Sequence, residues 1–599
     1  TKFLFAATTA LIAASILLTP ALQRNLEPHF LSAPESLSAF RSLLVGVGAS
    51  LIGATAIIFS VVMLAVQLNF ARIPFGLFRR LSSDVPLLAS FAATFMMGVA
   101  IGVCALLPDE TWIAPAVVLS GWCMLAALAL FFIAYIRALD LISPAKQIQI
   151  VLRKADRSMR RWEKRADRFA PLLENRPTSG INRDIARTSL FRLHPQWESE
   201  AREASSHVLA FARRYAEQGE YDISAIALNG LVGINGRYIS TRGNTFFASN
   251  PFFTNSLSAE ALISDTLEKL RRLAMSAQGR SDEEQFIQVM NTLAKLCATY
   301  AHIDYGRESG VELRHSQLAA SYLTGVAEGA KRTFGPDVLM EGVRLLGQCA
   351  LVLVQARRAL GAITIAKSIS TISLVGLAKP GHEPITSTAV QQLATLALEM
   401  LRSEEHDISH PSEEVRSSIR TVAHAVLLTA DTPFASQHSA HLKPYYALTD
   451  YGTFGDKLTK LINAVIDRPA TDDDAKRIIG HLLDWSDGIY EAEKQLLLAA
   501  VNKQSFLALD LINWICYITE VLVVASTAPA ASDHSRTELI QNATSLISVL
   551  DWLPDEKETV AFVENFHFIE QLFDVALKMH VIDCLLYTSD AADDLLCVD

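Results

Sequence analysis

Histidine and carboxylate side chains gather most densely in the stretch EEHDISHPSEE, Glu404–Glu414. His406 and His410, together with the carboxylates around them, are ligand types that suit a transition metal. The Pro-Ser pair after His410 instead looks like a helix start, where acidic residues are favoured by the positive end of the helix. His438 and His441 have an HxxH spacing but no carboxylate partner. We therefore predict helix capping here, with no metal and no cofactor.

Motifs of catalysis are also missing from the sequence. It contains no GxSxG elbow, no GxxxxGK[ST] phosphate-binding loop and no HExxH zinc helix. The seven cysteines are scattered singly without a CxxC pair, which argues against a zinc site or a disulfide framework. We predict no catalytic residues and favour a function other than catalysis.

Apolar segments near the N-terminus dominate the composition, which is 50% hydrophobic and only 19% charged. A membrane-spanning helix needs about 20 apolar residues. Four segments meet this length within a transmembrane region that we place at residues 1–142: Phe3–Leu22, Leu43–Leu68, Leu87–Leu107 and Ile113–Ile136. The first segment is the weakest, because its end also resembles that of a signal peptide.

Basic residues predict the orientation of these spans, because loops rich in Lys and Arg stay in the cytoplasm. The second loop carries three arginines, the third (PDET) carries no base, and the fourth span is followed by a basic run. We therefore expect the N-terminus and the C-terminal region to be cytoplasmic. The residues expected to meet lipid head groups are Arg72, Arg79, Arg80, Arg153, Lys154, Arg157, Arg160, Arg161 and Lys164.

The basic run forms one predicted helix, Pro144–Leu173, within a juxtamembrane segment at 143–174. Ile148, Val151 and Met159 would share its apolar face, opposite the bases. Such a helix could grip anionic head groups, each base contributing about 1 kcal/mol, or serve as a solvated stalk. Both roles are compatible.

Residues 1–172 carry a net charge of +7 and the remainder −17, which argues against nucleic acid as a partner.

Small residues recur every four positions on two spans, where they let helix backbones approach closely. The two ladders are Gly46, Ser50 and Ala54, and Thr94, Gly98 and Gly102. We favour packing within one bundle over contact between copies in a homo-oligomer. Gln67 and Asn69 lie where the second span ends; we favour a plain exit from the membrane, with a polar mouth as the alternative. No span holds a charge near its middle, which lowers the odds of ion-coupled transport but leaves a channel open.

Residues 175–583 read as one cytoplasmic helical domain, built of helix after helix with few alternating apolar runs. The predicted helices lie near 198–218, 221–241, 258–276, 282–303, 312–332, 337–358, 362–377, 386–402, 411–429, 445–466, 472–487, 503–526, 534–551 and 557–580. Paired helices of this length predict an α-solenoid-like array of hairpins, with a compact irregular domain as the alternative. The fold class is therefore all-α, a four-helix transmembrane region followed by helical hairpins.

Two stretches of this domain allow two interpretations each. Phe506–Ser526 is apolar enough for a fifth span, but Asp510 and Glu520 favour a core helix. The loop Thr241–Asn255 holds four phenylalanines, including Phe246. Exposed, they would mark a partner or membrane contact; folded back, they would plug the ends of neighbouring helices, which we favour.

The segment SVVMLAVQLNFARIPFGLFRRLSSD, Ser60–Asp84, resembles the stretch after the second span in a family of uncharacterised bacterial membrane proteins, domain of unknown function 2254. The matching residues are Ser60, Ala65, Gln67 and Leu68, then approximately Phe78, Arg79 and Asp84. The resemblance covers residues 43–155, and the family's signature in the soluble half is not found here. It implies a bacterial inner-membrane protein and brings no activity or catalytic residues.

The tail CLLYTSDAADDLLCVD, Cys584–Asp599, resembles a translated sequencing adapter, so we expect the native sequence to stop near Asp583. Taken together, the sequence predicts a multi-pass protein of the bacterial inner membrane that works as a membrane-anchored scaffold. Its partners would be the bilayer, a protein bound by the helical domain and, in an oligomer, further copies of itself. An oligomeric channel formed by the four spans is the alternative.

Overall fold

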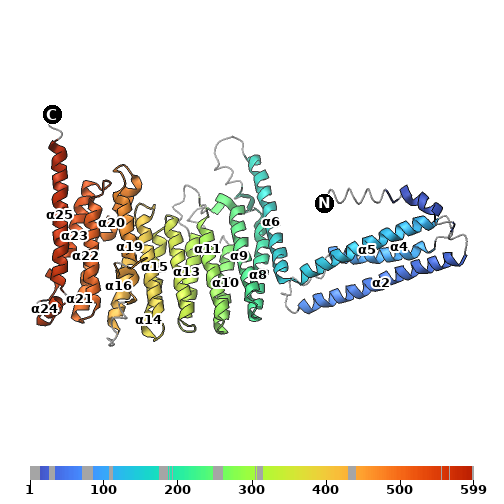
Figure 1. Cartoon of the computed structure of the whole chain (residues 1–599), viewed down its shortest axis with the longest axis horizontal. Helices are drawn as coiled ribbons and strands as arrows, with labels where there is room; N and C mark the ends of the chain where they lie inside the picture. The colour runs from blue at the N-terminus through green and yellow to red at the C-terminus, as the bar shows by residue number, and fades with distance from the viewer. Residues whose placement is uncertain are drawn as a thin grey trace. The chain divides into compact units, whose positions relative to one another are not determined.

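The computed structural model is all-α: the residues that it describes form α-helices and short 3-10 helices, and none of them forms a strand (Figure 1). The described residues are 14–15, 17–25, 28, 34–70, 85–106, 112–173, 187, 189–191, 193–246, 261–303, 305, 314–429, 440–448, 450–554, 556–565 and 567–595. The chain divides into two compact units, Thr1–Ser158 with Arg202–Leu231, and Met159–Ala201 with Val232–Asp599.

The first unit contains a bundle of three long apolar helices, α2 (Pro34–Phe70), α4 (Val85–Cys104) and α5 (Ile113–Ile142). Each helix contacts the other two. Proline is confined to first turns, as with Pro86 in α4, where its missing N–H costs no helical hydrogen bond. These helices contain the second and fourth predicted spans and most of the third, while most of the first predicted span lies outside the described residues.

The basic helix follows as α6 (Pro144–Leu173), with the bounds predicted from the sequence. The chain continues through a 3-10 turn, η2 (Pro195–Glu198), to α8 (Ser199–Glu217) and α9 (Tyr221–Arg242). A second 3-10 turn, η3 (Gly243–Phe246), ends this part of the chain. The boundary between the two compact units falls inside α6, inside α8 and again inside α9.

After α9, the second unit continues as a two-layered stack of helices. These are α10 (Ala261–Gly279), α11 (Glu283–Ala301), α12 (Arg314–Ala330), α13 (Pro336–Gln355), α14 (Leu360–Ala378), α15 (Glu383–Arg402) and α16 (Ser409–Leu428). Helices α11, α13 and α15 contact one another in one layer, and α10, α12, α14 and α16 do so in the other. Neighbours in the chain also pack together across the layers, as helical hairpins predict.

The C-terminal part departs from the predicted helices. It comprises α18 (Lys443–Tyr446), α19 (Phe454–Ile466), α20 (Asp473–Ser486), α21 (Ile489–Asn502), α22 (Leu507–Ser526), α23 (Asp533–Ile547), η4 (Ser548–Trp552), α24 (Lys557–Asn565) and α25 (Phe568–Leu595). The helix predicted at 445–466 is broken by a turn with Gly452 at φ 84°, and the one at 557–580 by His567 at φ 54°. Helix α21 was missed altogether.

Helix starts in the array follow ordinary capping chemistry. The side chains of Asp282, Thr453, Asp472 and Ser532 each accept a hydrogen bond from the backbone N–H three residues later. The Asp472 carboxylate meets the amide of Ala475 at 2.9 Å. The acidic TDDD signature therefore begins a helix where the sequence predicts one.

Five described helices are long and apolar enough to cross a bilayer, and their burial separates them into two groups. In Leu37–Leu64, Pro86–Cys104 and Ile113–Leu139, only 11%, 39% and 11% of the most apolar stretch is buried inside the protein. In Leu360–Ala378 and Leu507–Ser526, the buried share is 50% and 67%. Helix α22 contacts α19, α21, α23 and α25, so it is a core helix of the array, as predicted.

Candidate functional site: an apolar bundle and a basic helix

The tightest contact in the apolar bundle joins α2 to α4 at glycines. A Cβ atom placed on Gly48 would lie 2.8 Å from the carbonyl oxygen of Gly98 and 3.0 Å from the amide nitrogen of Gly102. A Cβ atom on Gly98 would lie 2.8 Å from a side-chain carbon of Ile52. The two backbones therefore touch without side chains between them, which is the packing that small residues allow in an apolar medium.

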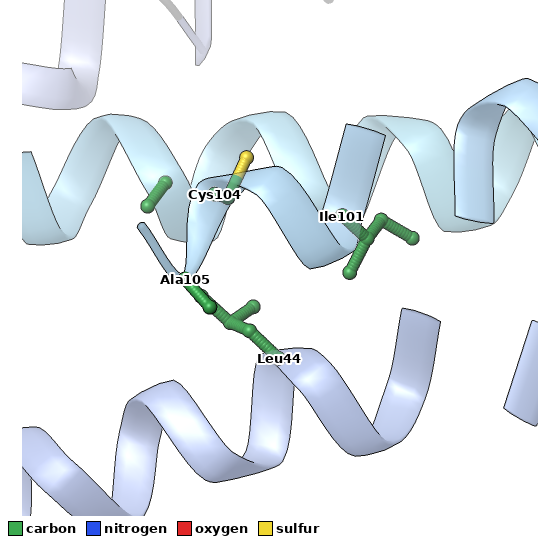
Figure 2. Close-up of a cluster of buried hydrophobic side chains, with 5 residues drawn as sticks. Leu44, Ile101, Cys104 and Ala105 are labelled. Carbon is green, nitrogen blue, oxygen red and sulfur yellow. The ribbon is translucent and has the colours of Figure 1, made fainter. Parts of the chain in front are cut away.

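Apolar clusters flank this crossing on both sides. Figure 2 shows one of them, in which Leu44 extends from α2 toward Ala105, beside Ile101 and Cys104 of α4. The other joins Leu87 and Phe91 of α4 to Ala134 of α5, and the Phe59 ring of α2 meets the Phe91 ring edge-on at 5.2 Å. Each cluster thus brings apolar side chains of all three helices together.

Only one of the two predicted small-residue ladders lies in this contact. Thr94 and Gly98 are buried on α4, and Gly102 lends its backbone to the contact with Gly48. On α2, by contrast, Gly46, Ser50 and Ala54 are exposed, and a Cβ atom on Gly46 would meet nothing within 4 Å. The predicted ladder on α2 thus does not pack within the described bundle; the contact face lies half a turn away, at Gly48.

The outer surface of the bundle is apolar along all three helices. Large side chains at least half exposed include Ile57, Val61, Met96, Leu128 and Phe132. A soluble monomer seldom exposes a contiguous apolar surface of this extent. Such a surface is typical of helices that are covered by lipid or by another protein.

Helix α6 divides into a buried apolar face and a charged outer face. Ile148, Val151, Ala155 and Met159 are buried, along with Ala166 further on. Because this face is covered by protein, α6 is not available to lie in a membrane interface with its apolar side in the lipid. Only its basic face can reach an anionic partner.

The basic face is largely free of internal partners. Arg153, Arg157, Arg160, Arg161 and Lys164 are exposed, and Lys154 is half-buried. Within the described part of the chain, five of these bases, Arg153, Lys154, Arg157, Arg161 and Lys164, form no ion pair and no hydrogen bond. Their charge is therefore open to an external anion.

The C-terminal half of α6 is fastened within the second unit. The Arg237 guanidinium donates to the Glu163 carboxylate, and both side chains are partly buried. The Trp162 ring lies 5.6 Å from the His194 ring, and the Arg165 guanidinium sits 4.8 Å above the Trp162 ring. These contacts hold the helix while leaving most of its bases outward.

Other predicted membrane residues lie outside the described part. Arg72, Arg79 and Arg80 fall in the segment between α2 and α4 that the structure does not describe. Gln67 and Asn69 belong to the described backbone of α2, but their side chains do not belong to the described residues. The interface loop and the polar mouth therefore stay predictions.

The histidine-rich stretch does not assemble a metal site. His406 and His410 are both exposed, and the neighbouring carboxylates are engaged elsewhere. Glu404 accepts from Arg357, and Glu405 accepts from the amide of Ala359 at 2.7 Å. Within the described residues, no three His, Cys, Asp or Glu side chains gather as metal ligands. His438 lies outside those residues.

Phe246 folds back into the protein, as we favoured. It is buried, its ring meets those of Tyr238, Tyr305 and His315, and Arg242 stacks on it at 4.6 Å. The other three phenylalanines of this loop lie outside the described residues.

A buried ionisable cluster in the C-terminal part escaped the sequence analysis. Glu493 of α21 is 3% exposed and faces Arg416 of α16 and Trp514 of α22. Tyr445 of α18 is also buried, and its ring lies 4.9 Å from that of Trp514. The sequence did not indicate Glu493 as a buried carboxylate, because no helix was predicted at α21. Without that helix, Glu493 could not be assigned to a buried face.

No protein-family model matches the chain, and no curated protein matches it. Among solved structures it is similar to one described as a circular tandem repeat protein with novel repeat topology and enhanced subunit contact surfaces. That match has 13% sequence identity and a TM-score of 0.35, and covers 73% of this chain and 91% of the other.

Proposed function

We propose that this chain is a multi-pass protein of the bacterial inner membrane that holds a helical array at the cytoplasmic face as a scaffold for a protein partner. The observation that carries the proposal is the exposed apolar surface of α2, α4 and α5, followed directly along the chain by the exposed bases Arg153, Arg157, Arg161 and Lys164 of α6. A bilayer would cover the first, and anionic head groups would neutralise the second. Stacked helices present the extended surfaces on which partners dock.

Anionic lipid is the partner that the basic face favours. Replacing Arg153, Arg157, Arg161 and Lys164 together by glutamine is expected to weaken anionic-lipid binding by up to about 4 kcal/mol, at about 1 kcal/mol per base. Native mass spectrometry of the full chain in micelles doped with phosphatidylglycerol would count the lipids retained. The loss should shrink as salt is raised, because salt screens exposed charges.

The matched control removes the same charge from the array. Arg332, Lys379, Arg402 and Lys443 are exposed or half-exposed bases with no ion pair in the described structure. Their replacement by glutamine should leave lipid retention unchanged. Equal losses of bound lipid in both variants would show that only the net charge of the chain matters. They would contradict the proposal that α6 binds the lipid.

An oligomeric channel is the second candidate, favoured by the outward ladder on α2. The contact between Gly48 and Gly98 leaves no room for a pore between α2 and α4, so a pore would have to run between copies. Ser50→Leu with Ala54→Leu is expected to shift the chain from oligomer to monomer in native mass spectrometry. Leucine at the equally exposed Ser60 is the control. A monomeric wild-type chain that still passes ions in liposomes would contradict this assembly.

A further inference from the structure

Glu493 sits among polar groups that the fold leaves unsatisfied. One oxygen of its carboxylate (Oε2), the Tyr445 hydroxyl and the Trp514 indole nitrogen are all buried and lack a hydrogen-bond partner of good geometry. Buried polar groups are almost always paired, so three buried groups in one place without a well-formed hydrogen bond require an explanation. The Trp514 N–H still lies close enough to the Glu493 carboxylate to favour its charged form. The aromatic rings around them stack closely, with Phe454 4.9 Å from Tyr445 and 5.7 Å from Trp485.

Opposite charge is near Glu493 but not in contact with it. Arg416 donates to the backbone oxygen of Trp485 instead, and no basic side chain in the described structure lies within ion-pair distance of the Glu493 carboxylate. Arg420, also on α16, contributes a weaker attraction from further away. A carboxylate that is fully buried and not directly paired is costly to keep ionised.

These surroundings favour the neutral acid. Burial raises the pKa of the Glu493 carboxyl to about 7, and Arg416, the Trp514 N–H and Arg420 only partly oppose this. Tyr445 and Tyr446 of α18 also face the carboxylate, and burial raises the pKa of each, so both stay neutral. On the neighbouring α20, His481 and Asp484 titrate, but neither acts on Glu493.

We propose that Glu493 is a proton-binding switch that fastens α21 to α16 and α22 when it is protonated and loosens them when it ionises. The neutral carboxyl has an O–H donor and no buried charge. The ionised form is stable only if water reaches it or if the helices around it move apart. The array would therefore respond to the pH of the compartment that surrounds it. This inference does not depend on the proposed membrane function.

The direction in which pH changes the stability of the array follows from the linkage between proton binding and folding. The folded pKa lies above the ordinary value of 4.5, so folding takes up a proton at pH values between the two. The stabilisation is fully present below 4.5 and is lost as the pH rises through about 7. Between pH 6 and pH 8 the folding equilibrium should fall by about tenfold. His481 works in the opposite direction, because burial lowers its pKa.

Hydrogen exchange of the full chain in micelles, corrected for intrinsic rates, tests the proposal. Wild-type amides of α21 and α22 should lose about tenfold in protection from pH 6 to pH 8. Glu493→Gln should abolish that loss and keep protection at pH 8. Glu491→Gln, an exposed glutamate on the same helix, should behave as wild type.

Either of two results would overturn it. If the amides of α21 and α22 in the wild type are equally protected at pH 6 and pH 8, the switch is rejected without any variant. A loss of protection that persists in Glu493→Gln would assign the titration to another group.

Discussion

Gly48→Leu is expected to force α2 away from α4 and to destabilise the apolar bundle by about 3 kcal/mol or more, the upper range for overpacking. The leucine has no free direction, because its Cβ atom already meets the Gly98 oxygen at 2.8 Å and the Gly102 nitrogen at 3.0 Å. Both obstacles are backbone atoms, so no rotamer change can relieve them. The helices must separate, and the neighbouring cluster at Leu44 and Ile101 must open with them.

Cys104 reports this opening locally, because its thiol is buried in that cluster. Mass spectrometry after brief maleimide treatment in micelles should show faster modification of Cys104 in Gly48→Leu than in wild type. Gly46→Leu is the matched control: it lies on the same helix with nothing within 4 Å of a Cβ atom. If Cys104 is modified at the same rate in both variants, the glycine crossing does not hold the bundle together.

Gly376→Ala and Gly325→Ala are expected to change stability in opposite directions. A Cβ atom on Gly376 of α14 would lie 2.4 Å from the Thr386 hydroxyl oxygen and 2.9 Å from the His382 carbonyl oxygen. The Thr386 hydroxyl cannot simply turn away without giving up its hydrogen bond to the Ser373 carbonyl, at 2.9 Å. We expect a loss of about 1–3 kcal/mol as α14 and α15 move apart.

Gly325 of α12 is exposed, and a Cβ atom there meets nothing within 4 Å. Alanine at this position should stabilise the chain by about 0.5–1 kcal/mol, since glycine is the poorer helix former. Pulse proteolysis across a urea series would give both midpoints in the full chain. A stabilising Gly376→Ala would show that the α14–α15 crossing has room that the structure does not show.

Helical content and many helix bounds could be predicted, because they depend on local features. Helix α6 begins at a Ser-Pro start and continues as long as its apolar and basic residues alternate at helical spacing. The Asp472 cap marked α20 in the same way. Charged residues within Leu507–Ser526 also indicated a core helix rather than a span, because Asp510 and Glu520 are only half-buried in the array and keep contact with water, which lipid would not allow.

Short helices and sharp turns were harder to predict from the sequence. Helix α21 is 14 residues long and starts at Gly488 with φ 64°, directly after α20, so its pattern merged with its neighbours. The turn at Gly452 likewise interrupted an apolar pattern that reads as one helix. In both places a left-handed residue redirects the chain, and composition alone does not reveal which glycine adopts that conformation.

By itself, the sequence determined that the chain is helical, where its apolar bundle lies and that a basic helix follows. Those properties arise from residue type and spacing along one element. Only the tertiary structure decided that Gly48 rather than Gly46 faces α4, and that Glu493 is buried near Arg416 and Trp514. A helix carries several small-residue ladders at once, and the neighbours that pack around it select which ladder is buried. Likewise, a carboxylate changes its protonation only when distant elements remove it from water.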